Sequence, residues 1–172
     1  VTVTAGTLST AKLVDLSGSS VLDLGNAAVA AVSGGTLAIG AGPGIGLAGT
    51  ARLITTGDLL TVASGATLST AASTVLVQVA GTGTSPVLSA VDLVDVAGTL
   101  TLGGSLLTVA ADTTLSGAVL RAASATLTPI SNQTLVSVTA GTLSTAKLVD
   151  LSGSSVLNLG NAAVAAVTGG SL

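Results

Sequence analysis

Short apolar segments alternate with small polar residues along the whole chain. In the first 26 residues, turns containing glycine are expected at residues 5–6, 17–18 and 25–26. The apolar groups between these turns predict strands of about four to six residues. Residues 26–32, NAAVAAV, have the helix propensity of alanine. Their neighbours are glycine pairs and valines without a helical period, so we predict a strand there too.

A phrase that starts with Val, passes through small residues and Gly, and closes with Leu recurs along the chain. The closing leucines are Leu8, Leu37, Leu68, Leu100, Leu143 and Leu172. The steps between them are nearly constant, except for a longer one from Leu100 to Leu143. A turn that recurs in this way predicts an all-β fold, a parallel β-solenoid (β-helix) built from coils of about 30 residues.

This coil length predicts how the leucines are arranged. We expect Leu8, Leu37, Leu68, Leu100 and Leu143 to lie over one another in one inward stack. The longer step before Leu143 is then explained by an inserted loop or by an extra partial coil. Glycine and proline mark further loops at residues 40–46, 81–86 and 128–132.

A much longer repeat lies above this one, because residues 1–37 return almost unchanged as residues 136–172. The two copies are identical at 33 of 37 positions. They differ at Thr2/Ser137, Asp23/Asn158, Ser33/Thr168 and Thr36/Ser171. The chain therefore divides into one full unit, residues 1–135, and the start of the next, residues 136–172, without a linker. We expect a segment of a longer tandem array that joins identical material, covalently or by stacking, at both ends.

The composition restricts the core and the partners. Apolar residues make up 48% of the chain, yet Phe, Trp, Tyr, Met, Cys, His and Glu are all absent. This predicts a narrow core in which small and β-branched side chains stack in repeated layers. Four Lys and Arg residues face seven aspartates, so we do not expect nucleic-acid binding. Few charges and many hydroxyl groups suit an extracellular fibre.

The phrase V-x-(S/A)-G-G-T-L, with its surroundings rich in Val, Leu, Thr and Gly, resembles the strand-repeat regions of bacterial surface adhesins. Examples of this class are filamentous haemagglutinin-like proteins and the β-solenoid passengers of autotransporters. The resemblance covers most of the chain in composition and rhythm. It implies secretion, a right-handed parallel β-helix, and a role in adhesion or biofilm structure.

Two short motifs are candidates for chemistry. Residues 44–49 match the dinucleotide-binding pattern G-x-G-x-x-G, but no helix is predicted after them, and we expect a glycine-rich turn. Asp92 and Asp95 are the only carboxylates close together in sequence. Side chains three residues apart on a strand leave from opposite faces, so we expect these two to diverge. Calcium binding by this pair is the alternative interpretation.

The remaining polar residues predict no site. Lys12 with Asp15, and Lys147 with Asp150, form the charged part of the duplicated block, which we interpret as a solvated surface. Asn132 begins a formal N-glycosylation sequon, whose use is left open. With no His, Cys or Glu, the chain lacks the usual parts of hydrolases and metalloenzymes. We therefore predict no catalytic, cofactor-binding or metal-binding residue and no cofactor.

These observations predict a structural segment of an extracellular or cell-surface fibre or stalk, without enzymatic activity. Its expected partner is itself, with a cell surface or matrix as a further contact, and neither nucleic acid nor a small-molecule substrate is expected. One alternative is an adhesin binding module made of β-sandwich repeats, although such domains usually contain a core Trp or Tyr. Another is an ice-binding solenoid, although Thr-x-Thr is found only at isolated places such as Thr2 and Thr4.

Overall fold

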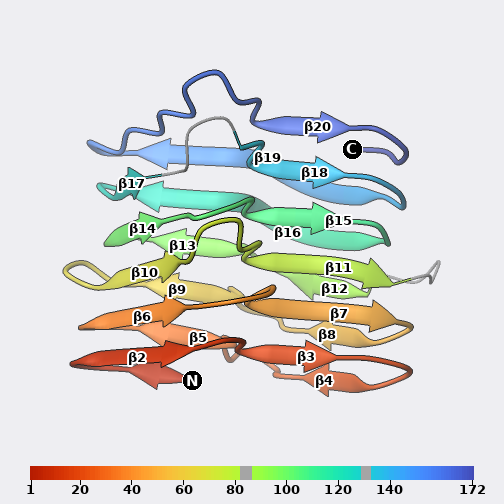
Figure 1. Ribbon diagram of the computed structural model, residues 1–172, viewed down its shortest axis with the longest axis horizontal. Coiled ribbons are helices and arrows are strands. Elements are labelled where there is room, and N and C mark those ends of the chain that lie inside the picture. Colours follow the sequence, from red (N-terminus) through yellow and green to blue (C-terminus); the bar gives the residue numbers. More distant parts are fainter. Residues whose placement is uncertain (82–86, 129–132) are drawn as a thin grey trace.

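The computed structural model describes residues 1–81, 87–128 and 133–172. The described residues form an all-β structure without a helix. Their strands pair in parallel and stack as a β-solenoid of about five turns with coils of about 30 residues. The predicted fold class is therefore confirmed. Figure 1 shows the layers, which run from the N-terminal coil at the bottom to the C-terminal coil at the top.

Each coil crosses four faces in a fixed order. Face 1 contains β1 (Thr2–Val3), β5 (Ala30–Val32), β9 (Leu60–Val62) and β13 (Val94–Val96). Face 2 contains β2 (Thr7–Thr10), β6 (Thr36–Ile39), β10 (Thr67–Thr70), β14 (Thr99–Thr101) and β17 (Thr126–Thr128). Face 3 contains β3 (Val14–Leu16), β7 (Ile45–Gly49), β11 (Val77–Gly81), β15 (Leu107–Val109), β18 (Val136–Val138) and β20 (Ala165–Val167). Face 4 contains β4 (Val21–Asp23), β8 (Arg52–Ile54) and β12 (Leu88–Ala90).

Two long strands run through the corner between face 4 and face 1. They are β16 (Thr113–Ala123) and β19 (Leu143–Ser152). The first part of β16 pairs with β12 on face 4, and its last part pairs with β13 on face 1. The pairing of β16 with β19 shifts register between Leu115 and Ala118, where the chain turns the corner. Faces 1 and 4 therefore form one nine-stranded sheet.

Hydrogen bonds between coils hold the stack together. On face 1, the amide of Ser33 donates to the carbonyl of Val3 at 2.9 Å, and the amide of Ala63 donates to the carbonyl of Val32 at 2.8 Å. The next step continues from Ala97 to Val62 at 2.7 Å. Each bond joins residues about one coil apart in sequence. Parallel strands cannot be joined by tight hairpins, so the strands of a coil obtain their ladder hydrogen bonds from the neighbouring coils. The bonds within a coil lie at its turns, as from Ala66 to Ala63 at 3.0 Å.

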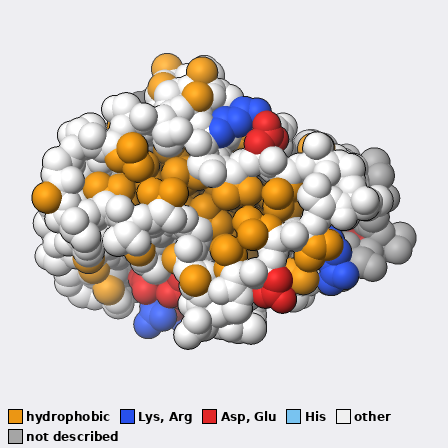
Figure 2. All heavy atoms as spheres, turned by 90° about the horizontal axis from the view of Figure 1, so that it is seen from below, with side chains coloured by type: hydrophobic (Ala, Val, Ile, Leu, Met, Phe, Trp, Pro, Cys, Tyr) orange, Lys and Arg blue, Asp and Glu red, His pale blue; other side chains and the backbone are white. Residues whose placement is uncertain are grey.

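The interior is one apolar cluster that runs through all layers. Leu37, Leu68 and Leu100 lie over one another on face 2 and are 0, 0 and 2% exposed. Leu8 begins this file in the first coil, where it is 40% exposed. Figure 2 views the stack from its N-terminal end and shows an apolar centre with polar groups around it.

The predicted place of Leu143 is wrong. The residue that follows Leu100 on face 2 is Leu127, whereas Leu143 lies on face 4 opposite Thr113. The longer step from Leu100 to Leu143 thus consists of one whole coil, which ends at Leu127, and a further half-coil. Of the two explanations offered for this step, the extra partial coil is confirmed.

The other local predictions have mixed outcomes. The alanine-rich residues 26–32 end in strand β5, as predicted. Residues 40–44 precede β7 as bends or non-repetitive structure, in agreement with a loop. Residues 82–86 and 129–132, which include Asn132, lie outside the described residues. Within the described ranges, no helix is long and apolar enough to cross a membrane.

Glycine is required at a point of close approach between consecutive coils. Gly35 has a φ of 75°, and a Cβ atom there would collide with the carbonyl oxygen of Gly6 in the coil below. The amide of Thr36 donates to this same oxygen at 2.8 Å. The Gly-Gly step of the recurring phrase is thus the point where one turn rests on the turn below it.

Leu68→Ala tests the inward file of face 2. We expect it to lower the free energy of unfolding by about 2–5 kcal/mol, because a fully buried leucine leaves a cavity when it is truncated. Leu8→Ala, in the same file but partly exposed, is the matched control and should cost much less. Urea denaturation of both variants measures the difference. Equal losses would contradict the assigned register.

Candidate functional site

Three carboxylates meet at the corner that leads from face 4 to face 1. Asp58, Asp92 and Asp95 each place a carboxylate oxygen within 4.8 Å of the others. The prediction that Asp92 and Asp95 diverge is therefore wrong. Alternation of side chains holds only within a strand, and Asp92 lies before the first residue of β13, in the corner. Asp58 occupies the same corner one coil earlier, and its side chain accepts a hydrogen bond from the amide of Asp92 at 3.2 Å.

Protein groups already satisfy the buried member of this cluster. Asp92 is 3% exposed, and its Oδ1 accepts a hydrogen bond from the amide of Ala118 at 2.5 Å. Its Oδ2 lies 3.4 Å from Nη1 of Arg121. Among the described residues, every buried side-chain nitrogen or oxygen has a hydrogen-bond partner. Asp92 thus joins its own coil to the next, in which a Cβ on Gly117 would collide with its carboxylate.

Asp95 is the carboxyl group whose ionisation is disfavoured at this corner. Burial raises the pKa of Asp95, and the neighbouring Asp58 and Asp92 raise it further, while Arg121 acts in the opposite direction. The same neighbours raise the pKa of Arg121, with Asp95 as the largest cause. On the outer side of face 1, Asp95, Arg121 and Asp150 follow one another in successive coils. A cation could bind the three aspartates only in competition with this guanidinium.

Face 2 carries a stripe of hydroxyl groups that the sequence analysis did not detect. Its strands place two outward residues in each coil, and these residues lie over one another in two files. The first file is Thr7, Thr36, Thr67, Thr99 and Thr126. The second file is Ser9, Ala38, Ser69, Thr101 and Thr128. We call these ten residues the hydroxyl stripe. The pattern Thr-x-Thr does not reveal this stripe in the sequence, because most of its strands carry Thr-x-Ser or Thr-x-Ala.

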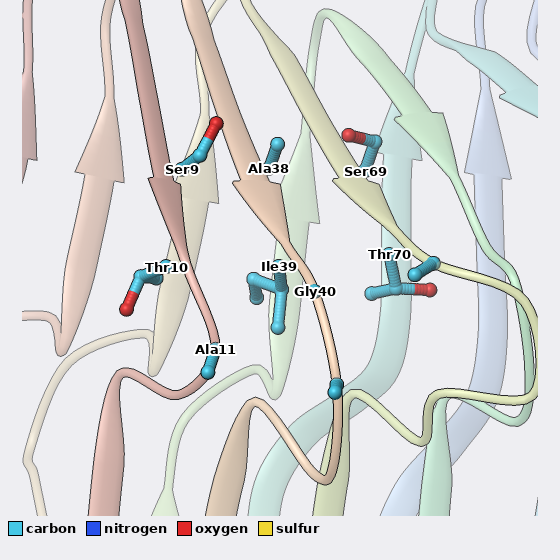
Figure 3. Close-up of a pocket in the computed structure, with 10 residues that line it drawn as sticks. Ser9, Thr10, Ala11, Ala38, Ile39, Gly40, Ser69 and Thr70 are labelled. Atoms are coloured by element: carbon cyan, nitrogen blue, oxygen red, sulfur yellow. The ribbon is translucent and has the colours of Figure 1, made fainter.

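A shallow groove of about 490 Å³ crosses three coils along the second file. Figure 3 shows Ser9, Ala38 and Ser69 side by side on neighbouring strands, with Ile39 further along the middle strand. The Thr70 hydroxyl, at one end of the groove, accepts a hydrogen bond from the amide of Gly103 at 2.7 Å. The groove is therefore lined by small apolar groups, with serine hydroxyls on both sides of Ala38.

The glycine-rich residues 44–49 form a strand, not the predicted turn. Ile45–Gly49 is β7, and strand β8 follows after two residues. Gly46 lies between Asp15 and Gln78 on face 3. A dinucleotide-binding fingerprint needs a helix directly after the glycines, whose N-terminus would bind the phosphates. The element that follows here is β8, so this segment offers no such site.

The charged pairs of the duplicated block are formed in both copies. Lys12 contacts Asp15 at 2.5 Å, and Lys147 contacts Asp150 at 2.8 Å. All four side chains are well exposed, so these pairs contribute little to stability. The change of Asp23 to Asn158 keeps the local bond, since a side-chain oxygen accepts from a glycine amide at 3.0 Å in both copies.

Asp95→Asn tests the electrostatics of the acidic corner, the cluster of Asp58, Asp92 and Asp95. A raised pKa means that folding favours the protonated carboxyl, and this advantage is lost as the pH rises through the folded-state pKa. The neutral amide removes the cost, so the variant should be more stable than the natural protein at neutral pH. The difference should shrink as the pH falls through the folded-state pKa and be nearly gone below pH 3.8, the ordinary value for this carboxyl. Denaturant titrations across this range measure it.

Asp23→Asn is the matched control for this measurement. Asp23 is exposed, and its counterpart in the second copy is already Asn158. Its effect on the free energy of unfolding should therefore be small. If Asp95→Asn were destabilising at neutral pH, the attraction of Asp95 to Arg121 would outweigh its burial, contrary to our interpretation.

No protein-family model, curated protein or solved structure matches this chain. The function is accordingly argued from the coil stack and its surfaces.

Proposed function

We propose that the chain is a structural segment of an extracellular fibre or stalk made of tandem β-solenoid units, without enzymatic activity. One observation carries this proposal: the start of the second unit packs onto the first unit as an ordinary coil. Val136, Val138 and Leu143 of the second unit are at most 1% exposed. They belong to the same apolar cluster as the core of the first unit.

The contact between the units uses the same bonds as any other coil boundary. Strand β18 pairs with β15 over three residues, and β19 pairs with β16 over eight. The amide of Thr139 donates to the carbonyl of Val109 at 2.8 Å, which continues the face 3 ladder. A further unit added in this way lengthens one stack and creates no second core. This geometry supports a continuous fibre. The β-sandwich alternative would instead require a chain of separate domains.

Shape and surface both bear on this role. The longest dimension of the described molecule runs across its coils, so an elongated fibre requires many units in series (Figure 1). The outward positions are mainly Ser, Thr, Ala and Gly, and the chain has only 6% charged residues. The partner that this arrangement supports best is another unit of the same kind. Cell-surface or biofilm attachment rests on the resemblance to surface adhesins.

Arrays of one, two and three units test the proposed fibre. Each added 135-residue segment should lengthen the particle by about 22 Å, since 135 residues make about four and a half coils of about 30 residues, and coils stack at about 4.8 Å each. The cross-section should stay constant, and the unfolding midpoint should rise with the number of units. Small-angle scattering and electron microscopy measure the dimensions. Flexibly linked beads would refute the proposal.

The hydroxyl stripe favours a second candidate function, binding to ice. Within each strand its hydroxyl positions lie about 6.7 Å apart, and between coils they lie about 4.8 Å apart. Each of the five strands of face 2 contributes a threonine to the first file, and the exposed Val156 follows Thr126 in the next coil. Such a regular and uncharged array resembles an ordered layer of hydrogen-bonding groups. Thr-x-Thr itself is found in only two of these strands, at Thr99 and Thr126, and the other three continue the array with Ser or Ala at the second position.

Thr67→Lys tests this second candidate. Thr67 lies at the centre of the first file, and a long charged side chain there should interrupt the array and reduce thermal hysteresis several-fold. Thr108→Lys is the matched control, because Thr108 is a half-buried outward threonine on face 3. Ice-growth measurements on both variants and on the natural protein give the answer. Absence of hysteresis in the natural protein would reject ice binding.

A further inference from the structure

The two copies of the duplicated block lie on opposite faces of the solenoid. Strand β3 of the first copy contains Asp15 and lies on face 3. The equivalent residue of the second copy, Asp150, pairs with Arg121 and lies on face 1. The same relation holds for the leucines, since Leu8 lies on face 2 and Leu143 on face 4. One sequence therefore occupies two positions that differ by half a turn.

The outward residues of faces 1 and 3 allow the half-coils to be counted. In chain order they are Thr2, Asp15, Ala31, Gly46, Thr61, Gln78, Asp95, Thr108, Arg121, Ser137, Asp150 and Ala166. Thr2 and its equivalent Ser137 are separated by nine half-coils in this series. The 135-residue unit is therefore four and a half coils long.

The block keeps its contacts to the neighbouring coil in both positions. In the first copy the amide of Thr36 donates to Gly6 at 2.8 Å, and in the second copy the amide of Ser171 donates to Gly141 at 2.9 Å. A Cβ on Gly170 would strike the Gly141 carbonyl, just as one on Gly35 would strike Gly6. Both copies thus make the same glycine contact to the coil below. They differ at the corner, because the first copy turns between β2 and β3, whereas the second copy continues through the single strand β19.

The cross-section permits this exchange because opposite faces bury equivalent side chains. Strands β13 on face 1 and β15 on face 3 each have one buried aliphatic residue on either side of a half-buried residue. Strands β9 and β18 share this pattern. No aromatic residue anywhere in the chain requires a wider space on one side. The interior therefore buries equivalent aliphatic residues on faces 1 and 3, although faces 4 and 1 form one sheet and faces 2 and 3 form two separate ones.

We infer that an array of these units presents each of its surfaces alternately on two opposite sides. This inference rests on the proposed fibre and adds the direction in which its surfaces point. The hydroxyl stripe lies on face 2, whereas Thr142 and Ser171, the equivalents of Thr7 and Thr36 in the second copy, lie on face 4. Their hydroxyls are hydrogen-bonded at 3.1 Å. The structural repeat is two units, and a partner that binds one unit is bound again on the opposite side by the next.

Engineered cysteine pairs in the 172-residue chain test the half-turn. The chain has no cysteine of its own, and residues stacked in adjacent coils are about 4.8 Å apart, within the range that a disulfide spans. Ser144→Cys is combined either with Thr114→Cys, its neighbour on face 4, or with Thr101→Cys on face 2. In a whole-coil register, position 144 would follow position 101. Ser69→Cys with Thr101→Cys, paired on face 2 in either case, is the positive control.

We expect positions 114 and 144 to cross-link on mild oxidation as readily as the control pair, while 101 and 144 stay reduced. Cross-linking of 101 to 144, or no cross-link at 144 while the control pair oxidises, would overturn the half-turn. This result is independent of the length of tandem arrays. Arrays that fail to elongate would refute the fibre and leave the half-turn intact. A cross-link between positions 101 and 144 would refute the half-turn and leave the fibre intact.

Discussion

The parallel hydrogen-bond ladder between coils is the constraint on which the rest of this structure depends. Each strand has its partners one coil away in sequence, so every coil must place a strand of similar length over the strand below. Side chains of one kind then come to lie over one another, as Thr67 lies over Thr36 and Leu68 over Leu37. The recurring Val-to-Leu phrase satisfies this requirement with a buried valine, a tight glycine step and a buried leucine.

The aliphatic composition has a consequence beyond stability. A core built from Val, Leu, Ile and Ala has no large ring that would require a particular corner. The first copy of the block buries Val3 on face 1, and the second copy buries its equivalent Val138 on face 3. A tryptophan in the block would need a matching space on both sides. The absence of aromatic residues therefore allows a unit length that is not a whole number of coils.

The sequence predicted the solenoid, its coil length and the first four members of the leucine file, because these depend on spacing along the chain. It did not predict which face a phrase occupies. Successive half-coils differ slightly in length, as the steps from Thr61 to Gln78 and from Asp95 to Thr108 show. The phrase is also the same on faces 2 and 4, so Leu143 was misplaced. The acidic corner and the hydroxyl stripe were missed because their members, such as Asp58 and Asp92, are adjacent only through the stack.

The half-turn also constrains how the unit could change in length. Gain or loss of one whole coil leaves every later strand on its original face. The alternation of sides then persists, because four and a half coils become five and a half or three and a half. Gain or loss of a half-coil would bring successive units into the same orientation and join their hydroxyl stripes on one side. The core would accept either change, since faces 1 and 3 bury equivalent side chains. A change by a whole coil and a change by half a coil would differ only in the outer surface. Selection for contacts on both sides of the fibre would therefore act on the unit length in steps of half a coil.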